Sequence, residues 1–273
     1  MSDTRGGDTA QLIWLSDLHF EAEGLVLGHD PRARLEAAID HINVHYRHPE
    51  TAMCVITGDL VDTSTPENYA ALWHRLDRLQ MPWVPLTGNH DTREVYLKHL
   101  PQPEGLQDGF AQCVFDLGVA WVICLDSLWD GHDAGLLCDA RLTWLEAQLK
   151  LCTGRPVLIF LHHPPVPLGL PMLDPDRLSN GAQLMALLGQ FPDVRQVCCG
   201  HVHRPVVAQA GQITVTSVRS VLYQAPPARP AWDWDSFTPS VEAPDMGIID
   251  ITDGQITIQF AEFCAAEYGI HPA

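Results

Sequence analysis

The sequence has few basic residues. Its 273 residues contain 16 Lys and Arg against 34 Asp and Glu, which gives a formal net charge of −18. Nucleic acids and anionic membranes are bound through clustered Lys and Arg side chains. The shortage of Lys and Arg therefore argues against DNA, RNA or a membrane surface as a partner. A small anionic substrate stays open, because bound divalent cations would reverse the local field in a pocket.

Long apolar runs are also absent. No run approaches the roughly 20 residues needed to span a bilayer, and the first residues, MSDTRGGDTAQ, lack the apolar stretch of a signal peptide. We therefore expect a cytoplasmic protein. The eight cysteines include no C-x-x-C pair. Several of them lie in apolar runs, so we expect buried free thiols in a reducing compartment.

Apolar strands alternate with helical patterns from Gln11 onward, which is typical of the α/β class. The predicted strands are 12–16, 53–57, 83–86, 120–125, 157–161, 197–199 and 213–218. The predicted helices are 32–47, one starting at about Pro66, 139–151 and 179–190. The pattern ends in a hairpin with Asp253-Gly254 in its turn. The proline within 83–86 disfavours a central position for that strand.

The pattern predicts a single domain over 11–273, preceded by a flexible tail over 1–10. Residues 222–246 interrupt the alternation with five prolines and with Trp232 and Trp234. A long irregular segment inside a compact domain usually has a function. We interpret this segment as a lid or an oligomer contact.

Five of the predicted strands end in side chains that commonly bind metals. The segments are LIWLSDLH (Asp17, His19), CVITGDLVD (Asp59), VPLTGNHD (Asn89, His90, Asp91), LIFLHHPP (His162, His163) and VCCGHVH (His201, His203). In open α/β folds, functional residues gather beyond the carboxyl ends of strands. Strand ends placed side by side would therefore bring these side chains to one site.

The residue types favour a binuclear metal centre. A carboxylate can bridge two cations, and imidazole together with carboxylate suits Zn, Mn, Fe or Co better than Ca or Mg. Residues two apart on an extended segment point the same way, so each D-x-H or H-x-H pair can supply two ligand atoms. One such pair is weak evidence in a chain with 14 His. Five strand-end motifs in order, each after an apolar strand, indicate a metal site.

The order D-x-H, G-D, G-N-H-D, H-H-P-P, G-H-x-H resembles the calcineurin-like metallophosphoesterase superfamily. HHPPVPLG, the following LDP…NG and the 39-residue step from His162 to His201 resemble its class III cyclic nucleotide phosphodiesterases, which include a glycerophosphodiesterase branch. The motifs cover residues 17–203. The resemblance implies a four-layer α/β/β/α sandwich with a binuclear metal site at its edge and two divalent ions as cofactors (Mn, Fe, Zn or Co).

The resemblance also implies a role for each motif residue. The first ion would be held by Asp17, His19 and His203, the second by Asn89, His162 and His201, and both by Asp59. Asn89 and His90 would bind the substrate, and His90 would be the catalytic residue, with Asp91 as a candidate to orient it. A hydroxide bound between the ions would attack phosphorus.

The sequence lacks the arginine of the G-D-x-x-D-R-G motif that is typical of protein phosphatases. That arginine grips a monoester dianion, so its absence favours a small phosphodiester. A 3′,5′-cyclic nucleotide and a glycerophosphodiester both stay open. Candidates for stacking a base are Phe20, Tyr223, Trp232 and Trp234, each of which could equally pack into the core.

Three other functions stay open. The fold would also suit a phosphomonoesterase or a non-catalytic metal-binding scaffold, although every expected ligand position is filled. A nucleotide-binding regulator is disfavoured, because no G-x-x-x-x-G-K loop is present. Related enzymes are often oligomeric, so we expect a homo-oligomer that acts on a small-molecule phosphodiester.

Overall fold

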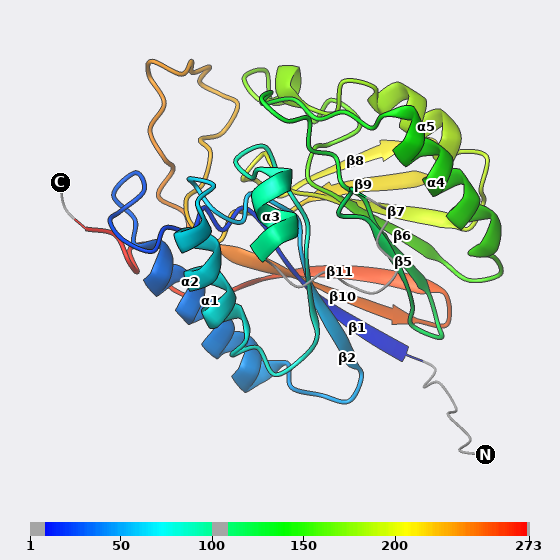
Figure 1. Cartoon of the computed structure of the whole chain (residues 1–273), viewed down its shortest axis with the longest axis horizontal. Coiled ribbons are helices and arrows are strands. Elements are labelled where there is room, and N and C mark those ends of the chain that lie inside the picture. Colours follow the sequence, from blue (N-terminus) through cyan, green and yellow to red (C-terminus); the bar gives the residue numbers. More distant parts are fainter. Residues whose placement is uncertain (1–8, 100–108, 272–273) are drawn as a thin grey trace.

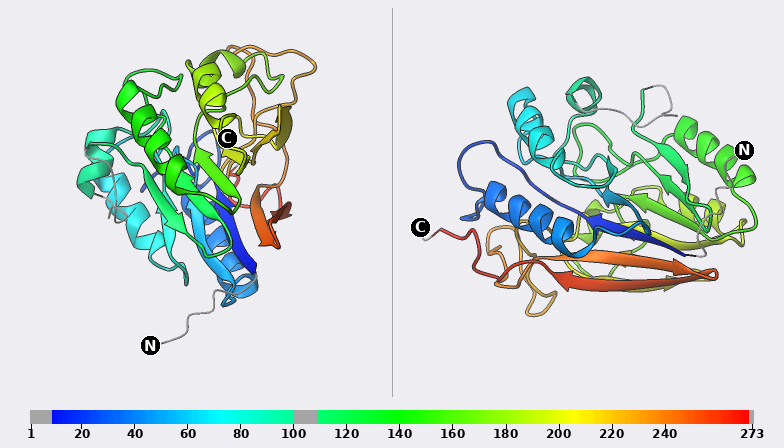
Figure 2. Two further views of the ribbon diagram at one scale, coloured as in Figure 1. Left: turned by 90° about the vertical axis from the view of Figure 1, so that its right-hand side faces the viewer. Right: turned by 90° about the horizontal axis from the view of Figure 1, so that it is seen from below.

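The computed structural model describes residues 9–99 and 109–271. Two β-sheets lie face to face, and helices cover the outer face of each sheet (Figures 1 and 2). Strand β1 (Thr9–Leu15) begins inside the range 1–10 that the sequence predicts as a tail. The rest of that range, 1–8, lies outside the described residues.

The first sheet has the order β11-β10-β1-β2-β3. Besides β1 it contains β2 (Thr51–Ile56), β3 (Trp83–Pro85), β10 (Asp245–Thr252) and β11 (Gln255–Glu262). Strands β1, β2 and β3 are parallel, and β10 is antiparallel to β1. The proline-containing β3 lies at the edge of the sheet, where a missing backbone N–H is tolerated.

The second sheet has the order β4-β5-β6-β7-β9-β8. Its strands are β4 (Cys113–Asp116), β5 (Trp121–Cys124), β6 (Val157–Leu161), β7 (Val194–Cys199), β8 (Val206–Ala210) and β9 (Ile213–Ser217). Four of them, β5, β6, β7 and β9, are parallel. Both sheets therefore bring carboxyl ends of parallel strands to one edge of the molecule.

The helices form the two outer layers. Helices α1 (Pro31–His45) and α2 (Pro66–Leu76) pack on the first sheet, and α4 (Asp139–Leu151) and α5 (Gly181–Leu188) pack on the second. Helix α3 (Arg93–His99) and the short 3₁₀ helix η1 (Asp174–Asp176) follow loops near the carboxyl ends of the strands. No helix among the described residues combines the length and the apolar character that crossing a membrane requires.

The alternation of side chains along the strands creates three layers of core. In β1, Trp14 packs between the sheets while Leu15 packs against the helices of the first sheet. In β6, Phe160 packs between the sheets, and Leu161 packs against α4 and α5. Strands buried on both faces read as continuous apolar runs, which is why the sequence located them. The predicted α/β/β/α sandwich is confirmed.

Short or half-exposed elements are missing from the sequence prediction. Strand β8 and helix α3 are partly exposed, so their sequences lack a strong apolar pattern, and β4 has only four residues. The predicted hairpin is confirmed: β10 and β11 pair in register, with Asp253 and Gly254 at positive φ in the turn. All eight cysteines lie within the described residues and have free thiols.

Gly247 of β10 pairs with Trp14 of β1, and the indole covers the space above the glycine. A Cβ added at residue 247 would lie 2.7 Å from Trp14 Cε3. We expect Gly247→Ala to lower the free energy of unfolding by about 1–3 kcal/mol, because the core there has no room. Urea unfolding measures this loss.

The matched control is the same substitution in a Trp14→Leu background, where the smaller side chain leaves room for the methyl group. There the added cost of Gly247→Ala should shrink to a few tenths of a kcal/mol, which gives a clear coupling between the two sites. Equal costs in both backgrounds would contradict this account of the β1–β10 contact.

Candidate metal centre

Five strand ends of the two sheets meet at one site. Asp17 follows β1, Asp59 follows β2, and the loop after β3 contains Asn89. From the second sheet, His162 comes directly after β6 and His201 follows β7. The structure thus brings together the strand-end residues that the sequence singles out. They come from both sheets, because the parallel strands of both end at the same edge.

The backbone is left-handed at most of these positions. Seven described non-glycine residues have positive φ, and five of them belong to the expected ligand set. These five are Asp17 (53°), His19 (40°), Asp59 (46°), His201 (71°) and His203 (51°). A left-handed conformation costs a non-glycine residue about 1–3 kcal/mol where the surroundings must impose it. The fold keeps this conformation at the strand ends, where it turns the side chains toward one another.

A first group of ligand atoms surrounds Asp17. His203 Nε2 lies 3.3 Å from Asp17 Oδ1 and 3.1 Å from His19 Nε2. His19 Nε2 in turn lies 3.6 Å from Asp59 Oδ2. One ligand atom from each of these four buried residues falls within 4.8 Å of the others. Imidazole nitrogen and carboxylate oxygen at such spacing can hold a divalent metal ion.

A second group surrounds Asn89. Its Oδ1 lies 3.1 Å from His162 Nε2 and 3.0 Å from His201 Nδ1. His162 Nε2 also lies 3.5 Å from Asp59 Oδ2. Asp59 therefore presents the same oxygen, Oδ2, to a histidine of each group. Its other oxygen, Oδ1, accepts a hydrogen bond of 2.9 Å from the His90 backbone N–H.

Two glycines make the close approach possible. Gly58 has a φ of 91°, and a Cβ there would lie 2.6 Å from His162 Nδ1. A Cβ on Gly88 would collide with the Asp59 carboxylate. Side chains at either position would push apart the loops that present Asp59 and His162, so the G-D and G-N-H-D motifs need their glycines for steric reasons.

The far side of three of the four ligand imidazoles is also held. His162 Nδ1 lies 2.7 Å from Thr57 O, and His203 Nδ1 lies 2.9 Å from Tyr223 O. His19 Nδ1 lies 3.0 Å from Asp62 Oδ1. Partners of this kind fix the ring orientation and the tautomer of metal-binding histidines. In each of the three rings, Nε2 is left to face the other ligand atoms.

The electrostatic field at the site favours cations. Burial opposes ionisation of Asp17 and Asp59, but the neighbouring imidazoles outweigh it and hold the pKa of both carboxyls below their usual range. Burial likewise disfavours charge on His162, but Asp59 and Asp17 outweigh it and raise its pKa to about 9. A field that attracts a proton to this position also attracts a metal cation.

Burial favours the neutral form of two further imidazoles, His19 and His201, and a histidine must be neutral to bind a metal ion. Burial lowers the pKa of His19. Burial and the charge of His162 lower the pKa of His201 to about 3. His201 Nε2 is buried and has no hydrogen-bond partner among the described residues. The donor set and its charges thus fit the divalent metal ions that the sequence predicts.

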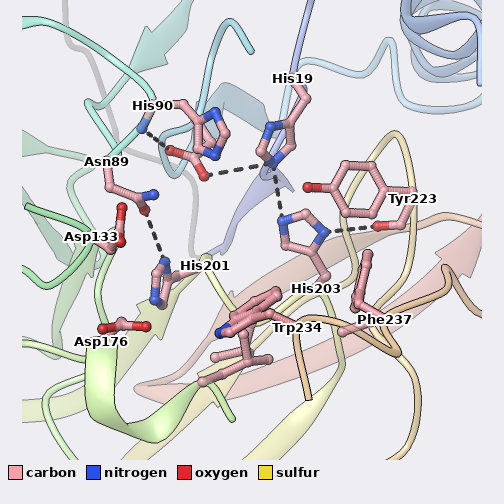
Figure 3. Close-up of a pocket in the computed structure, with 14 residues that line it drawn as sticks. His19, Asn89, His90, Asp133, Asp176, His201, His203, Tyr223, Trp234 and Phe237 are labelled. Atoms are coloured by element: carbon pink, nitrogen blue, oxygen red, sulfur yellow. Dashed lines mark hydrogen bonds and ion pairs between the residues drawn. The ribbon is translucent and has the colours of Figure 1, made fainter. Parts of the chain in front are cut away.

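His90 lies beside these groups and lines the pocket (Figure 3). Its Nδ1 lies 3.0 Å from Asp62 O and 3.6 Å from Asp62 Oδ1. Burial opposes charge on His90, but Asp59 and Asp62 outweigh it and raise its pKa above the ordinary value. Asp62 contacts both His90 and His19, and the sequence analysis missed this role. One indication of this role was present in the sequence, namely that Asp62 lies three residues after Asp59 in the GDLVD segment.

Asp91 has a different role from the one considered for it. Its carboxylate accepts hydrogen bonds from the Tyr69 hydroxyl at 2.7 Å, the Gly88 N–H at 2.8 Å and the Leu60 N–H at 3.1 Å. Its side chain therefore ties the loop after β3 to α2 and does not orient His90. Adjacent residues at a turn point in different directions, which is why Asp91 diverges from His90.

His163 is buried next to the second group, and its ring contacts the rings of both His162 and His201. Its own nitrogens are engaged elsewhere: Nδ1 lies 2.8 Å from Ser127 Oγ, and Nε2 lies 3.1 Å from Asp133 O. Burial and the charge of His162 lower its pKa well below the ordinary value. These contacts support the ring of His162 from behind.

The ligand groups open into a cavity of about 370 Å³ (Figure 3). Of the four aromatic candidates, Tyr223 and Trp234 line it. Phe20 is fully buried among the core residues beneath α1 and α2, and Trp232 is partly buried against the other core and is not among the lining residues. The sequence analysis missed Phe237, which also lines the cavity, because nothing distinguishes this residue within its irregular segment.

Comparison with known proteins identifies the same family that the sequence motifs resemble. Residues 11–205 match the family model of the calcineurin-like phosphoesterases. Glycerophosphodiester phosphodiesterase GpdQ of Enterobacter lignolyticus is 31% identical over 221 residues, which cover 79% of this chain and 78% of that protein. A Rhodopseudomonas palustris protein named "probable cyclic nucleotide phosphodiesterase" is 36% identical over 200 residues, covering 72% of each chain.

A crystal structure of a dimetal phosphatase from Danio rerio has the same fold. It superposes with a TM-score of 0.69 at 14% identity, covering 94% of this chain and 97% of the other. The family match spans the five strand-end motifs, and both relatives extend over more than two thirds of the chain. The protein therefore belongs to the calcineurin-like phosphoesterase family.

Proposed function

We propose that this protein is a binuclear metal-dependent phosphodiesterase that hydrolyses small phosphodiesters. The oxygen of a water molecule bonds to phosphorus, the bond from phosphorus to one alcohol oxygen breaks, and that oxygen receives a proton. The product is a phosphomonoester, and an acyclic diester also releases a separate alcohol. The observation that supports this function is the position of Asp59, whose Oδ2 lies between His19 of one ligand group and His162 of the other.

The two groups would each hold one divalent ion. The first ion would be held by Asp17, His19 and His203, the second by Asn89, His162 and His201, and both by Asp59. Bound divalent ions neutralise phosphoryl oxygens and lower the pKa of bound water to about 7. The mixture of imidazole, carboxylate and amide donors favours Mn, Fe, Zn or Co.

His90 would act on the substrate directly. Its Nδ1 is held by Asp62, so Nε2 is the ring nitrogen that remains for the substrate. We assign to it the protonation of the leaving oxygen, or a hydrogen bond to a phosphoryl oxygen as charge develops there. Asn89 adds an amide next to the same space and helps to position the phosphate.

The lining of the cavity favours a small diester. It contains no Lys or Arg among the described residues, and it includes Asp59, Asp133 and Asp176. A monoester dianion or a nucleic-acid strand would need more positive charge than this cavity provides. The two relatives are named for a glycerophosphodiester and a cyclic nucleotide substrate, and both are small diesters.

The segment 222–246, whose last two residues belong to β10, would cover the chain's own site, because Tyr223, Trp234 and Phe237 line the cavity. This segment is drawn in orange at the upper left of Figure 1, beyond the carboxyl ends of the strands. The single domain, the homo-oligomeric state and the cytoplasmic location stay predictions from the sequence.

Replacing Asn89 tests the second ligand group. We expect Asn89→Ala to lower kcat/KM for bis(p-nitrophenyl) phosphate by at least about 100-fold in the presence of Mn²⁺, because one ligand and one substrate contact are lost. The matched control is Asn43→Ala, which removes a half-buried amide that bonds to Arg78 O and Gln80 N. It should keep wild-type activity. Equal activities for the two variants would refute the assignment of Asn89.

Metal content tests the two groups separately. After removal of metal with a chelator and dialysis against Mn²⁺, we expect wild type to bind two ions per chain. His203→Ala removes a ligand only from the first group, so it should keep one tightly bound ion, counted by mass spectrometry of the metal. One ion in wild type, or two undisturbed ions in His203→Ala, would contradict the binuclear assignment.

A further inference from the structure

Loop 226–239 brings two aromatic rings to the cavity. Trp234 and Phe237 both line it, and their ring centroids lie 5.7 Å apart (Figure 3). Within the described part of the chain, the hydrogen bonds of this loop join only Asp233 and Ser236, which both belong to it. The place of the loop therefore depends on the packing of its side chains and on how its two ends are held.

One arginine outside the loop holds the two ends together. Arg204 Nη1 donates a hydrogen bond of 2.5 Å to Ala225 O, just before the loop, and one of 2.7 Å to Glu242 Oε2, just after it. Its Nη2 donates a further bond of 3.3 Å to Glu242 Oε1. Between these contacts, the Ser240 N–H donates a 2.9 Å bond to Gln224 O. The base of the loop is thus closed by a backbone bond and by one guanidinium.

Arg204 also belongs to the stretch of chain that presents an expected metal ligand. It directly follows His203, and its carbonyl oxygen accepts a hydrogen bond of 2.6 Å from the Ser217 hydroxyl of β9. His203 Nδ1 in turn lies 2.9 Å from Tyr223 O. The base of the loop is therefore tied twice to the same stretch of chain, once through His203 and once through Arg204.

The pair of Arg204 and Glu242 is partly shielded from water. The two side chains are 17% and 28% exposed. Burial opposes ionisation of Glu242, but Arg204 and Arg219 outweigh it and hold the pKa of this carboxyl below its usual range. Hydrogen bonds from a guanidinium to both oxygens of a carboxylate are stronger than neutral ones, and they also fix the relative orientation of the two groups. The pair is therefore suited to hold the loop in one position.

We propose that Arg204 is a positioning residue of the active site. Together with Glu242 it holds loop 226–239 closed over the cavity, where the aromatic rings of the loop cover a bound substrate. This inference rests on the proposed diesterase function and adds to it a residue that does not touch the substrate. Without the guanidinium, the two ends of the loop are free to separate, and the rings move away from the cavity. The ligand groups stay in place, because other contacts hold their side chains.

The test separates substrate binding from the chemical step. In the Mn²⁺-loaded protein, we expect Arg204→Ala to raise KM for bis(p-nitrophenyl) phosphate by about tenfold, which is the size of effect that the loss of a charged hydrogen bond produces. We expect kcat to stay within about twofold of the wild type, since a contribution to binding alone changes KM and not kcat. The metal content should equal that of the wild type.

Related variants locate the effect in the pair. Arg204→Lys keeps the charge but lacks the fork that reaches Ala225 O and both oxygens of Glu242, so its KM should lie between those of wild type and Arg204→Ala. Glu242→Gln should raise KM several-fold. Adding it to Arg204→Ala should cause no further rise, because both changes break the same contact. The matched control is Arg155→Ala, which breaks a pair of the same type with Asp116 at the amino end of β6 and should keep the wild-type KM.

Cleavage of the loop by chymotrypsin is a readout that needs no turnover. This protease cuts after aromatic residues, and the loop offers Trp232, Trp234 and Phe237. A loop must leave its place to enter the protease, so the rate of cleavage follows the population of the open form. At a temperature where circular dichroism shows every variant folded, we expect Arg204→Ala to be cut in the loop at least about fivefold faster than wild type. Arg155→Ala should be cut at the wild-type rate.

Several results would overturn the proposal. They are an unchanged KM in Arg204→Ala, a fall in kcat as large as the rise in KM, a loss of metal, and loop cleavage no faster than in the wild type. Cleavage spread over the whole chain would show global unfolding and would equally overturn a local role. If Arg204→Ala does not fold, Glu242→Gln decides the matter by the same measurements.

The proposed function has its own point of failure. A wild type that does not hydrolyse bis(p-nitrophenyl) phosphate with any of the four metals would overturn the diesterase function. The cleavage rates would still decide whether Arg204 holds the loop, because they require neither metal nor substrate.

Discussion

The burial of one carboxylate between two sets of histidines organises this molecule. Asp59 is almost fully buried, and its Oδ2 faces His19 on one side and His162 on the other. A charged group in such surroundings is stable only when cations or hydrogen-bond donors compensate it. The His90 backbone N–H satisfies one oxygen. The other oxygen needs a protonated imidazole or a metal ion beside it.

The sandwich supplies the rigidity that this arrangement needs. Three layers of buried side chains fix the strands, and the site residues lie within a few positions of where the strands end. The left-handed backbone at Asp17, Asp59 and His201 costs free energy that a mobile loop could not sustain. Packing of the two sheets sustains it, and the closely spaced glycine loops allow the ligand atoms to approach one another.

How much of the fold and of the candidate site could be predicted from the sequence depended on how regular the apolar pattern of each element is. Strands that are buried on both faces, such as β6, can be recognised in the sequence as apolar runs. The expected ligand residues follow these runs closely in the chain. The expected ligand residues were therefore accessible to sequence reasoning as a group of strand-end side chains, and so was the fold class. Residues that line the cavity from irregular segments could not be predicted. Asp133 and Phe237 follow no strand end, and only the folded structure brings them to the cavity. Asp91 was only a candidate to orient His90, and its side chain bonds to Tyr69 instead, because adjacent residues at a turn point in different directions.

The cavity has an inner part at the ligand groups and an outer part beyond them. The inner part concentrates negative charge to hold metal ions, and it suits attack on phosphorus. The outer part is lined by the carboxylates of Asp133 and Asp176 and by aromatic rings. The central claim concerns the inner part, and hydrolysis of bis(p-nitrophenyl) phosphate in ¹⁸O-labelled water by the Mn²⁺-loaded protein tests it most directly. Attack at phosphorus places the label in the phosphomonoester, as mass spectrometry would show; label in the nitrophenol, or no hydrolysis, would contradict the account.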